Sequence, residues 1–240
     1  TLAIHKQFEQ EFSHAENPGH LGKSLAICLG DFLLFLGAEL LVSLPPRLQK
    51  EIAEYWGNVA FAQMLDIKNG QTKGEPAKQD IQSIYIHKTA HYTFTVPLVI
   101  GASLEGIQPK ELLRLKELGK TMGLIYQMRD DELGIFGTAI GKPVGSDISE
   151  NKKTLLRQHL FSQVNETKRV HLERLFGKEN LTSEELQYIQ TILEELGIMR
   201  TMKKRMERLA ANAYSIIDHL QLKDAQGLKS LVEYSIQRKK

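Results

Sequence analysis

Long apolar segments with helical spacing run through almost the whole chain and limit the folds open to it. Hydrophobic residues recur three and four positions apart, and proline, glycine or short polar stretches separate the segments. No segment shows the alternation of a β-strand. Long helices with short breaks are typical of a helical bundle. No repeat or linker divides the chain, so we predict an all-α fold with a single domain over residues 1–240.

Prolines and capping residues set the ends of the predicted helices. Pro45 and Pro46 end one helix, and Pro46 can start the next. Thr182 and Glu185 have the spacing of a capping box. The polar segment 68–78 is expected to be a loop. The predicted helices cover residues 21–44, 46 to the polar loop, 81–104, 109–133, 154–176, 182–196 and 200–220, followed by a short basic terminal helix.

Charge and cysteine content exclude several classes of protein. A net charge of +2 over 240 residues gives no electrostatic reason to expect nucleic-acid binding. The single cysteine, Cys28, rules out an internal disulfide framework and cannot build a zinc site by itself. It lies in an apolar segment, so we expect it to be a core residue in a reducing compartment.

The apolar segment from Leu25 to Leu44 raises the question of a membrane span. It contains Asp31 and Glu39, each of which costs about 2.5–3.5 kcal/mol at a bilayer centre. We therefore expect a buried helix and no transmembrane segment. No secretory signal opens the sequence, and a cytoplasmic location is expected.

The segment QMRDDELGIFG, residues 127–137, has the residue types of a magnesium site. Asp130 and Asp131 follow a helical apolar pattern, and Gln127 shares a helix face with both. Mg²⁺ prefers oxygen ligands and is commonly held by one or two carboxylates together with substrate phosphates. Two neighbouring aspartates are more often a solvated surface pair than a metal site. The residues around them must therefore distinguish these two interpretations.

Basic residues follow these carboxylates. The stretch GKPVGSDISENKKT, residues 141–154, carries Lys142 and Lys152, whose ammonium groups can neutralise phosphate oxygens that a metal does not reach. The combination predicts a magnesium-diphosphate site.

Four segments together resemble the polyprenyl synthetase family, the trans-isoprenyl diphosphate synthases. QMRDDELGIFG is similar to the second aspartate-rich motif of that family, and GKPVGSDISENKKT to the lysine-bearing loop after it. IYIHKTAHYTFTVPLVIGASLEG resembles the family's Lys-Thr-Ala helix, and LAICLGDFLLFLGAELL an earlier helix with a Gly-Asp pair. The resemblance implies the helical fold of isoprenoid synthases.

The resemblance also implies roles for individual residues. Asp130 and Asp131 would bind the magnesium ions that hold an allylic diphosphate, and Lys88, Lys142 and Lys152 would contact that diphosphate.

A second set would surround the reacting carbon. Lys88, Thr89 and Gln127 match positions whose oxygen atoms stabilise an allylic cation and help accept the lost proton. Gln63 and Asp66 match another polar pair lining the same cavity.

Four other residues near Lys88 are expected to be structural. His87 and His91 match no functional position and are interpreted as hydrogen-bonded helix histidines. Tyr92 and Phe94 could stabilise a cation through their rings, but aromatic residues at helical spacing are more often core.

The implied reaction is the condensation of isopentenyl diphosphate with an allylic diphosphate by a Mg²⁺-dependent prenyltransferase. The product would be a short-chain diphosphate, farnesyl or geranylgeranyl, and the implied assembly is a homodimer. Gly134 stands where many members of the family carry a third aspartate, a variant that resembles some short-chain synthases.

Two family motifs are missing from the sequence. It contains neither another aspartate-rich motif nor an Arg-Arg-Gly stretch, and residues 1–12 resemble the part just after that stretch. We expect a fragment of an active synthase without its first helices. The alternatives are a non-catalytic partner subunit of a heteromeric synthase and, more weakly, a terpene cyclase. The basic tail, Arg238 to Lys240, is expected to be a frayed, solvated terminus.

Overall fold

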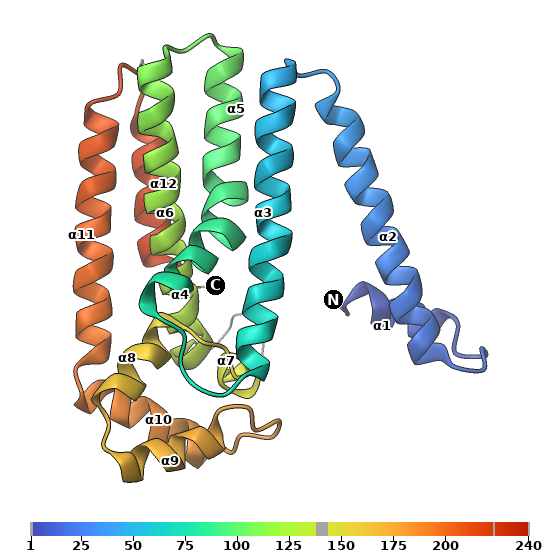
Figure 1. Cartoon of the computed structure of the whole chain (residues 1–240), viewed down its shortest axis with the longest axis vertical. Helices are drawn as coiled ribbons and strands as arrows, with labels where there is room; N and C mark the ends of the chain where they lie inside the picture. Colours follow the sequence, from blue (N-terminus) through green and yellow to red (C-terminus); the bar gives the residue numbers. More distant parts are fainter. Residues whose placement is uncertain (1, 138–143, 223, 240) are drawn as a thin grey trace. The chain divides into compact units, whose positions relative to one another are not determined.

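Helices form nearly all of the structure, a computed structural model that describes residues 2–137, 144–222 and 224–239. No strand occurs in these ranges, which confirms the predicted all-α class. The helices are α1 (Ile4–Glu11), α2 (Pro18–Leu41), α3 (Pro46–Gln71), α4 (Lys78–Tyr85), η1 (Ile86–Thr95), α5 (Val96–Leu104), α6 (Pro109–Phe136), α7 (Ser146–Ser149), α8 (Leu155–Gln163), α9 (Glu166–Leu175), α10 (Ser183–Glu195), α11 (Ile198–Asp218) and α12 (Gln226–Gln237) (Figure 1).

The chain divides into two compact units, Thr1–Ala53 and Glu54–Lys240. The boundary falls inside α3 and not in a linker. The prediction of a single domain over residues 1–240 stays a prediction.

In the first unit, α1 packs along α2, and most of α2 remains exposed. Gly22 is its one buried residue, so the prediction of a buried helix here is wrong. The physical reason is that the eight residues of α1 are too few to cover a helix of 24 residues. Cys28 is exposed for the same reason, which corrects its assignment to a core.

By length and composition, α2 is the one helix among the described residues that could cross a membrane. A core helix of a soluble protein can have the same length and composition.

In the second unit, α6 is the central helix, and both hydrophobic cores share it (Figure 1). One core joins α6 to α8–α11 and includes Met128, Leu156 and Met202. The other joins α6 to α11 and α12 and includes Met122 and Val232. A helix buried on several sides holds its polar residues in fixed positions.

Several helix ends confirm or correct the predictions. Thr182 and Glu185 form the expected capping box at the start of α10. The predicted helix 154–176 is two helices, because Val164 has an extended backbone and the side chain of Asn165 caps α9. α1 was not predicted.

A π-helix interrupts the predicted helix 81–104. α4, η1 and α5 follow one another without a break, and η1 is the wide segment. It packs against α6 at Gly119 and Gly123, where any added Cβ would overlap Thr95 and Ala90. Wide helical turns often occur at functional sites. The close contact brings η1 beside the aspartate pair of α6.

Candidate active site

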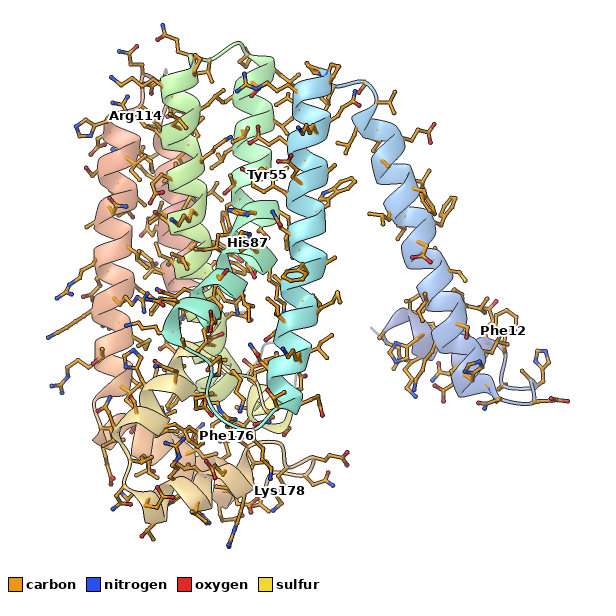
Figure 2. The ribbon with its side chains drawn as sticks, in the orientation of Figure 1. Phe12, Tyr55, His87, Arg114, Phe176 and Lys178 are labelled. Atoms are coloured by element: carbon orange, nitrogen blue, oxygen red, sulfur yellow. The ribbon has the colours of Figure 1, made fainter. Side chains whose placement is uncertain are left out.

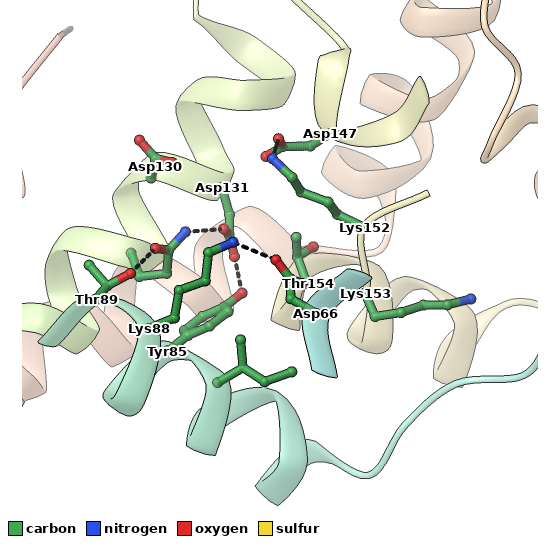
Figure 3. A pocket seen from close by; sticks show the side chains of 12 residues that line it. Asp66, Tyr85, Lys88, Thr89, Asp130, Asp131, Asp147, Lys152, Lys153 and Thr154 are labelled. Atoms are coloured by element: carbon green, nitrogen blue, oxygen red, sulfur yellow. Dashed lines mark hydrogen bonds and ion pairs between the residues drawn. The ribbon is translucent and has the colours of Figure 1, made fainter. Parts of the chain in front are cut away.

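A cavity of about 170 Å³ brings the aspartate pair of α6 together with residues from α3, α4, η1, α7 and the segment after α7 (Figure 3). Its lining is mainly polar, and both charge signs are present. The lining residues are Asp66, Ile84, Tyr85, Lys88, Thr89, Gln127, Asp130, Asp131, Asp147, Lys152, Lys153 and Thr154.

Asp131 is the buried carboxylate of this cavity, with 3% of its surface exposed. Tyr85, also buried, donates its hydroxyl hydrogen to Asp131 and accepts a hydrogen bond of 3.0 Å from the Leu155 N–H. Burial raises the pKa of Asp131 to about 8, although hydrogen bonds from Tyr85 and Gln127 lower it. The negative charges of Asp147 and Asp130 raise it further. The site therefore favours a proton or a cation on this carboxylate.

Three side chains from η1 and α6 form a hydrogen-bond chain that ends at Asp131. Thr89 Oγ1 donates to Gln127 Oε1 at 2.8 Å, and Gln127 Nε2 donates to Asp131 Oδ1 at 3.1 Å. This direction leaves the lone pairs of Thr89 Oγ1 free to face the cavity, because the hydroxyl hydrogen is committed to Gln127.

Two of the three lysines that line the cavity are each paired with an aspartate. Lys88 Nζ on η1 lies 2.5 Å from Asp66 Oδ2 on α3, and Lys152 Nζ lies 2.5 Å from Asp147 Oδ1 on α7 (Figure 3). Burial lowers the pKa of Lys152, but the hydrogen bond and charge of Asp147 outweigh it and raise the pKa above its usual value. Lys152 therefore remains protonated at neutral pH.

Asp147 lies beside Gly134, the position at which a third aspartate is missing. A Cβ added to Gly134 would come within 2.5 Å of Asp147 Oδ2. A side chain at position 134 would therefore require the Asp147 carboxylate to shift. Asp147 was not among the predicted site residues. Its position five residues before Lys152 was the signal that could have found it.

The residues present fit magnesium. In the part of the chain that the structure describes, no three histidine, cysteine or acidic side chains are close enough together to hold an ion by themselves. Mg²⁺ commonly binds one or two carboxylates and completes its shell with water and substrate phosphates. Asp130 and Asp131, which line one cavity with three lysines, match that arrangement. The raised pKa of Asp131 marks the carboxylate that gains most from a cation.

Comparison with known proteins identifies the family. A family model described as Polyprenyl synthetase matches residues 10–193, most of the chain. The chain belongs to this family. A short chain isoprenyl diphosphate synthase of Methanocaldococcus jannaschii is 38% identical over 97 residues, which are 40% of this chain and 30% of that relative. A geranylgeranyl diphosphate synthase of Sulfolobus acidocaldarius is 26% identical over 231 residues, 91% of this chain and 69% of the relative.

Solved structures of polyprenyl synthetases show the same fold. A geranylgeranyl pyrophosphate synthase from Corynebacterium glutamicum, crystallised with isoprenyl diphosphate and magnesium, aligns with a TM-score of 0.87 and 26% identity. The alignment covers 98% of this chain and 70% of that structure. The chain thus spans 30%, 69% and 70% of the lengths of these three proteins.

The structure brings most of the predicted polyprenyl synthetase residues into one cavity. Asp66, Lys88, Thr89, Gln127, Asp130, Asp131 and Lys152 line it. Lys142 lies outside the described residues. Gln63 is exposed and is not among the lining residues, so its role stays a prediction.

The C-terminal tail corrects another prediction. Arg238 is buried, with 8% of its surface exposed, and it bonds to Asp130 through Nη2. Its Nη1 donates to the Tyr126 hydroxyl at 2.8 Å, and its guanidinium carbon lies 3.8 Å from the centre of the Tyr126 ring. Arg129 Nε donates to the Arg238 carbonyl at 3.0 Å. These contacts hold the tail on α6, so Arg238 is not part of a frayed terminus.

The residues around Lys88 also differ from expectation. Among the described residues, the Nδ1 atoms of His87 and His91 are buried and have no hydrogen-bond partner, which differs from the prediction of hydrogen-bonded histidines. The His87 and His91 rings pack edge to face, and the His91 ring also contacts Tyr55. Figure 2 labels Tyr55 and His87 in this region. Tyr92 is 50% exposed, whereas Phe94 packs on Tyr126 at the edge of the core.

Proposed function

We propose that this chain carries out Mg²⁺-dependent prenyl transfer, condensing isopentenyl diphosphate with an allylic diphosphate to give a short-chain prenyl diphosphate. The observation that carries the proposal is one cavity in which Asp130 and Asp131 share the lining with Lys88 and Lys152. The names of the related proteins, farnesyl and geranylgeranyl diphosphate synthases, support the same reaction class.

The proposed first step breaks the C–O bond of the allylic diphosphate, and the diphosphate leaves with the electron pair. Lys88 and Lys152 stabilise the charge that develops on the departing oxygens, and each must turn from its aspartate partner toward the substrate. Bound magnesium would supply further charge stabilisation to the same oxygens. Asp130 and Asp131 would be its protein ligands.

The second step joins the two substrates. The double bond of isopentenyl diphosphate attacks the allylic cation, and the new cation then loses a proton. Thr89 Oγ1 offers its lone pairs to the cation because its hydrogen is bound to Gln127. We infer that the departing diphosphate accepts this proton, with the Thr89 oxygen as a stabilising neighbour.

The test uses the purified chain with geranyl diphosphate, labelled isopentenyl diphosphate and Mg²⁺. Asp130→Ala should lower incorporation of label by about 100-fold or more, since a metal ligand contributes several kcal/mol to the transition state. The free energy of unfolding should fall by about 1–3 kcal/mol, because Asp130 is 46% exposed but its partner Arg238 is buried and loses an acceptor. Asp80→Ala, at an exposed site on α4, is the matched control.

Two results would speak against the proposal. Equal losses of stability and activity in Asp130→Ala would give Asp130 a structural role. Failure of the chain to bind geranyl thiodiphosphate in the presence of Mg²⁺ would remove the proposed site itself. Binding without turnover would favour the partner-subunit alternative, which the retained carboxylates and lysines do not otherwise favour.

We also propose that the chain works as a homodimer. Support comes from α2, which exposes a dense set of large apolar side chains. Those at least 54% exposed include Phe32, Leu33, Leu34, Phe35 and Leu40. An apolar surface of this kind is typical of an interaction site.

A further inference from the structure

A second cavity, of about 370 Å³, lies away from the candidate active site. Its lining comes from Lys78 at the start of α4, His159 on α8, and one face of α11. The α11 residues are Thr201, Met202, Lys204, Arg205 and Arg208. None of these residues lines the catalytic cavity, so the two cavities are separate.

The charges of this second cavity have one sign. Lys78, Lys204, Arg205 and Arg208 are all cationic, and no acidic residue is part of the lining. Among the described residues, none of these four cations takes part in an ion pair within the 4.0 Å limit. The lysines of the catalytic cavity differ, because each is paired with a carboxylate.

Arg205 gives an independent sign of a missing partner. Its Nη1 atom is buried and has no hydrogen-bond acceptor in the described part of the chain. A buried donor without an acceptor costs free energy, and more so when the group is charged. An anion in the cavity would supply the acceptor.

The electrostatics of the neighbouring histidine agree. Burial lowers the pKa of His159, and the positive charges of Lys78 and Arg205 lower it further. His159 therefore senses a positive potential from two different helices, α4 and α11. At neutral pH its neutral imidazole can still donate one hydrogen bond.

We propose that this second cavity is a binding site for a phosphate-bearing anion. Several cations converging on a concave surface match the charge of a diphosphate group better than that of a single carboxylate. Arginine forks pair well with phosphate oxygens. The volume lies within the usual range of small-ligand sites. The site extends beyond the proposed reaction, because the residues of prenyl transfer do not line it.

Calorimetric titration of the whole chain with inorganic diphosphate tests the site. EDTA is present so that magnesium-dependent binding in the catalytic cavity does not contribute. The test variant is Lys204→Gln/Arg208→Gln, and the matched control is Arg200→Gln/Lys203→Gln. Both remove two exposed positive charges from α11, but only the first pair lines the cavity. We expect the dissociation constant to rise about tenfold or more in the test variant and less than threefold in the control.

Two further experiments show which cavity binds the anion and whether the anion is a free ligand or a lipid headgroup. Lys152→Gln, in the catalytic cavity, should leave this binding unchanged. Sedimentation with phosphatidylcholine vesicles containing phosphatidic acid distinguishes a lipid headgroup from a free ligand. The proposal is supported if the test variant, but not the control, loses binding to diphosphate or to the vesicles. Which of the two is lost shows whether the anion is a free ligand or a lipid headgroup.

Other outcomes would overturn the proposal. An equal loss of diphosphate affinity in both double variants would show that α11 attracts anions through its overall positive charge and not through a defined site. Loss in Lys152→Gln alone would place the anion in the catalytic cavity. The absence of binding by the wild-type chain to both millimolar diphosphate and vesicles would also reject it. Circular dichroism confirms that each variant is folded.

Discussion

Tyr85 is the residue that fixes the buried carboxylate, and its hydroxyl group joins two distant segments. It donates to Asp131 on α6 and accepts from the backbone of Leu155 on α8. Neither partner is near it in sequence. Tyr85 therefore acts as a positioning residue for the proposed metal ligand.

Tyr85→Phe should destabilise the chain and weaken metal binding. The change leaves the Leu155 N–H without its acceptor, which costs about 1–3 kcal/mol of unfolding free energy. Removal of a hydrogen bond that lowers the pKa of Asp131 should raise that pKa and increase the Mg²⁺ concentration needed for half-maximal binding of geranyl thiodiphosphate. Urea unfolding and calorimetry measure both effects.

Tyr92→Phe is the control for this change, because Tyr92 lies on η1 and is half exposed. It should leave both quantities within experimental error. An unchanged Mg²⁺ requirement in Tyr85→Phe would show that Asp131 does not depend on the hydroxyl.

His91 should make stability depend on pH. Burial lowers its pKa to about 4, and the charges of His87 and Lys120 act in the same direction. The unfolded chain binds the proton at about pH 6.5, so stability is complete above that value and is lost as pH falls from 6.5 toward 4. Because the ring is partly solvated, we expect a loss of about 1–2 kcal/mol from this group.

Urea unfolding at pH 7 and pH 5 measures this loss. In His91→Gln the difference between the two pH values should shrink, whereas His20→Gln, at an exposed position, should keep it. An undiminished difference in His91→Gln would assign the pH dependence to other groups.

Residues that form local motifs were predictable, and residues that act alone were not. Asp130, Asp131 and Gln127 share one helix face, so their spacing revealed them. Tyr85 and Arg238 reach Asp131 and Asp130 across 46 and 108 positions of sequence. No local pattern records such contacts.

The packing of η1 on α6 decides whether Thr89 and Gln127 meet. Gly123→Ala should cost about 1–3 kcal/mol or more, because the new Cβ overlaps the backbone and side chain of Ala90. It should also lower prenyl transfer by separating Thr89 from Gln127. Thermal unfolding and labelled-substrate assays measure the two effects.

Gly101→Ala is the matched control on α5, where nothing lies within 4 Å of an added Cβ. It should stabilise the helix by about 0.5–1 kcal/mol. Equal behaviour of the two variants would mean that the contact between η1 and α6 adapts freely.

Helix type and helix ends were only partly readable from sequence. Apolar spacing found α6, α10 and α11 closely, and Asn165 carried a capping signal that could have divided the predicted helix 154–176. The π-helix left no such signal, because its width follows from packing against the glycines of α6. The spacing of apolar residues predicts that α2 is a helix. It does not show which other segments pack on that helix, so its exposure could not be predicted.

The C-terminus and α6 are joined through Arg238, so the tail should influence the metal site. Arg238→Gln should improve Mg²⁺ binding in the presence of geranyl thiodiphosphate, since the guanidinium already occupies Asp130 as a competing cation. It should also cost about 1–3 kcal/mol of stability. Calorimetry and urea unfolding test both.

Lys239→Gln, at the exposed neighbouring position, should change neither quantity. Weaker Mg²⁺ binding in Arg238→Gln would show that the arginine orients Asp130 for the metal and does not compete with it.

The proposed homodimer predicts that α2 controls association. Phe35 is 71% exposed, and Phe35→Asp should shift the molecular mass measured by light scattering from two chains toward one, because a charge opposes apolar burial. Leu113→Asp, at a 68% exposed leucine on α6, is the control. A wild-type chain that is monomeric at micromolar concentration would contradict the dimer.

The contact between Gly134 and Asp147 changes how the acidic motif should be counted. Reading DDELG alone gives a site with one carboxylate fewer than the full three-aspartate pattern. In space, the side chain of Asp147 stands beside the glycine and lines the same cavity as Asp130 and Asp131. A count of aspartates along α6 alone therefore misses one carboxylate of the cavity, which α7 supplies and which is paired with Lys152.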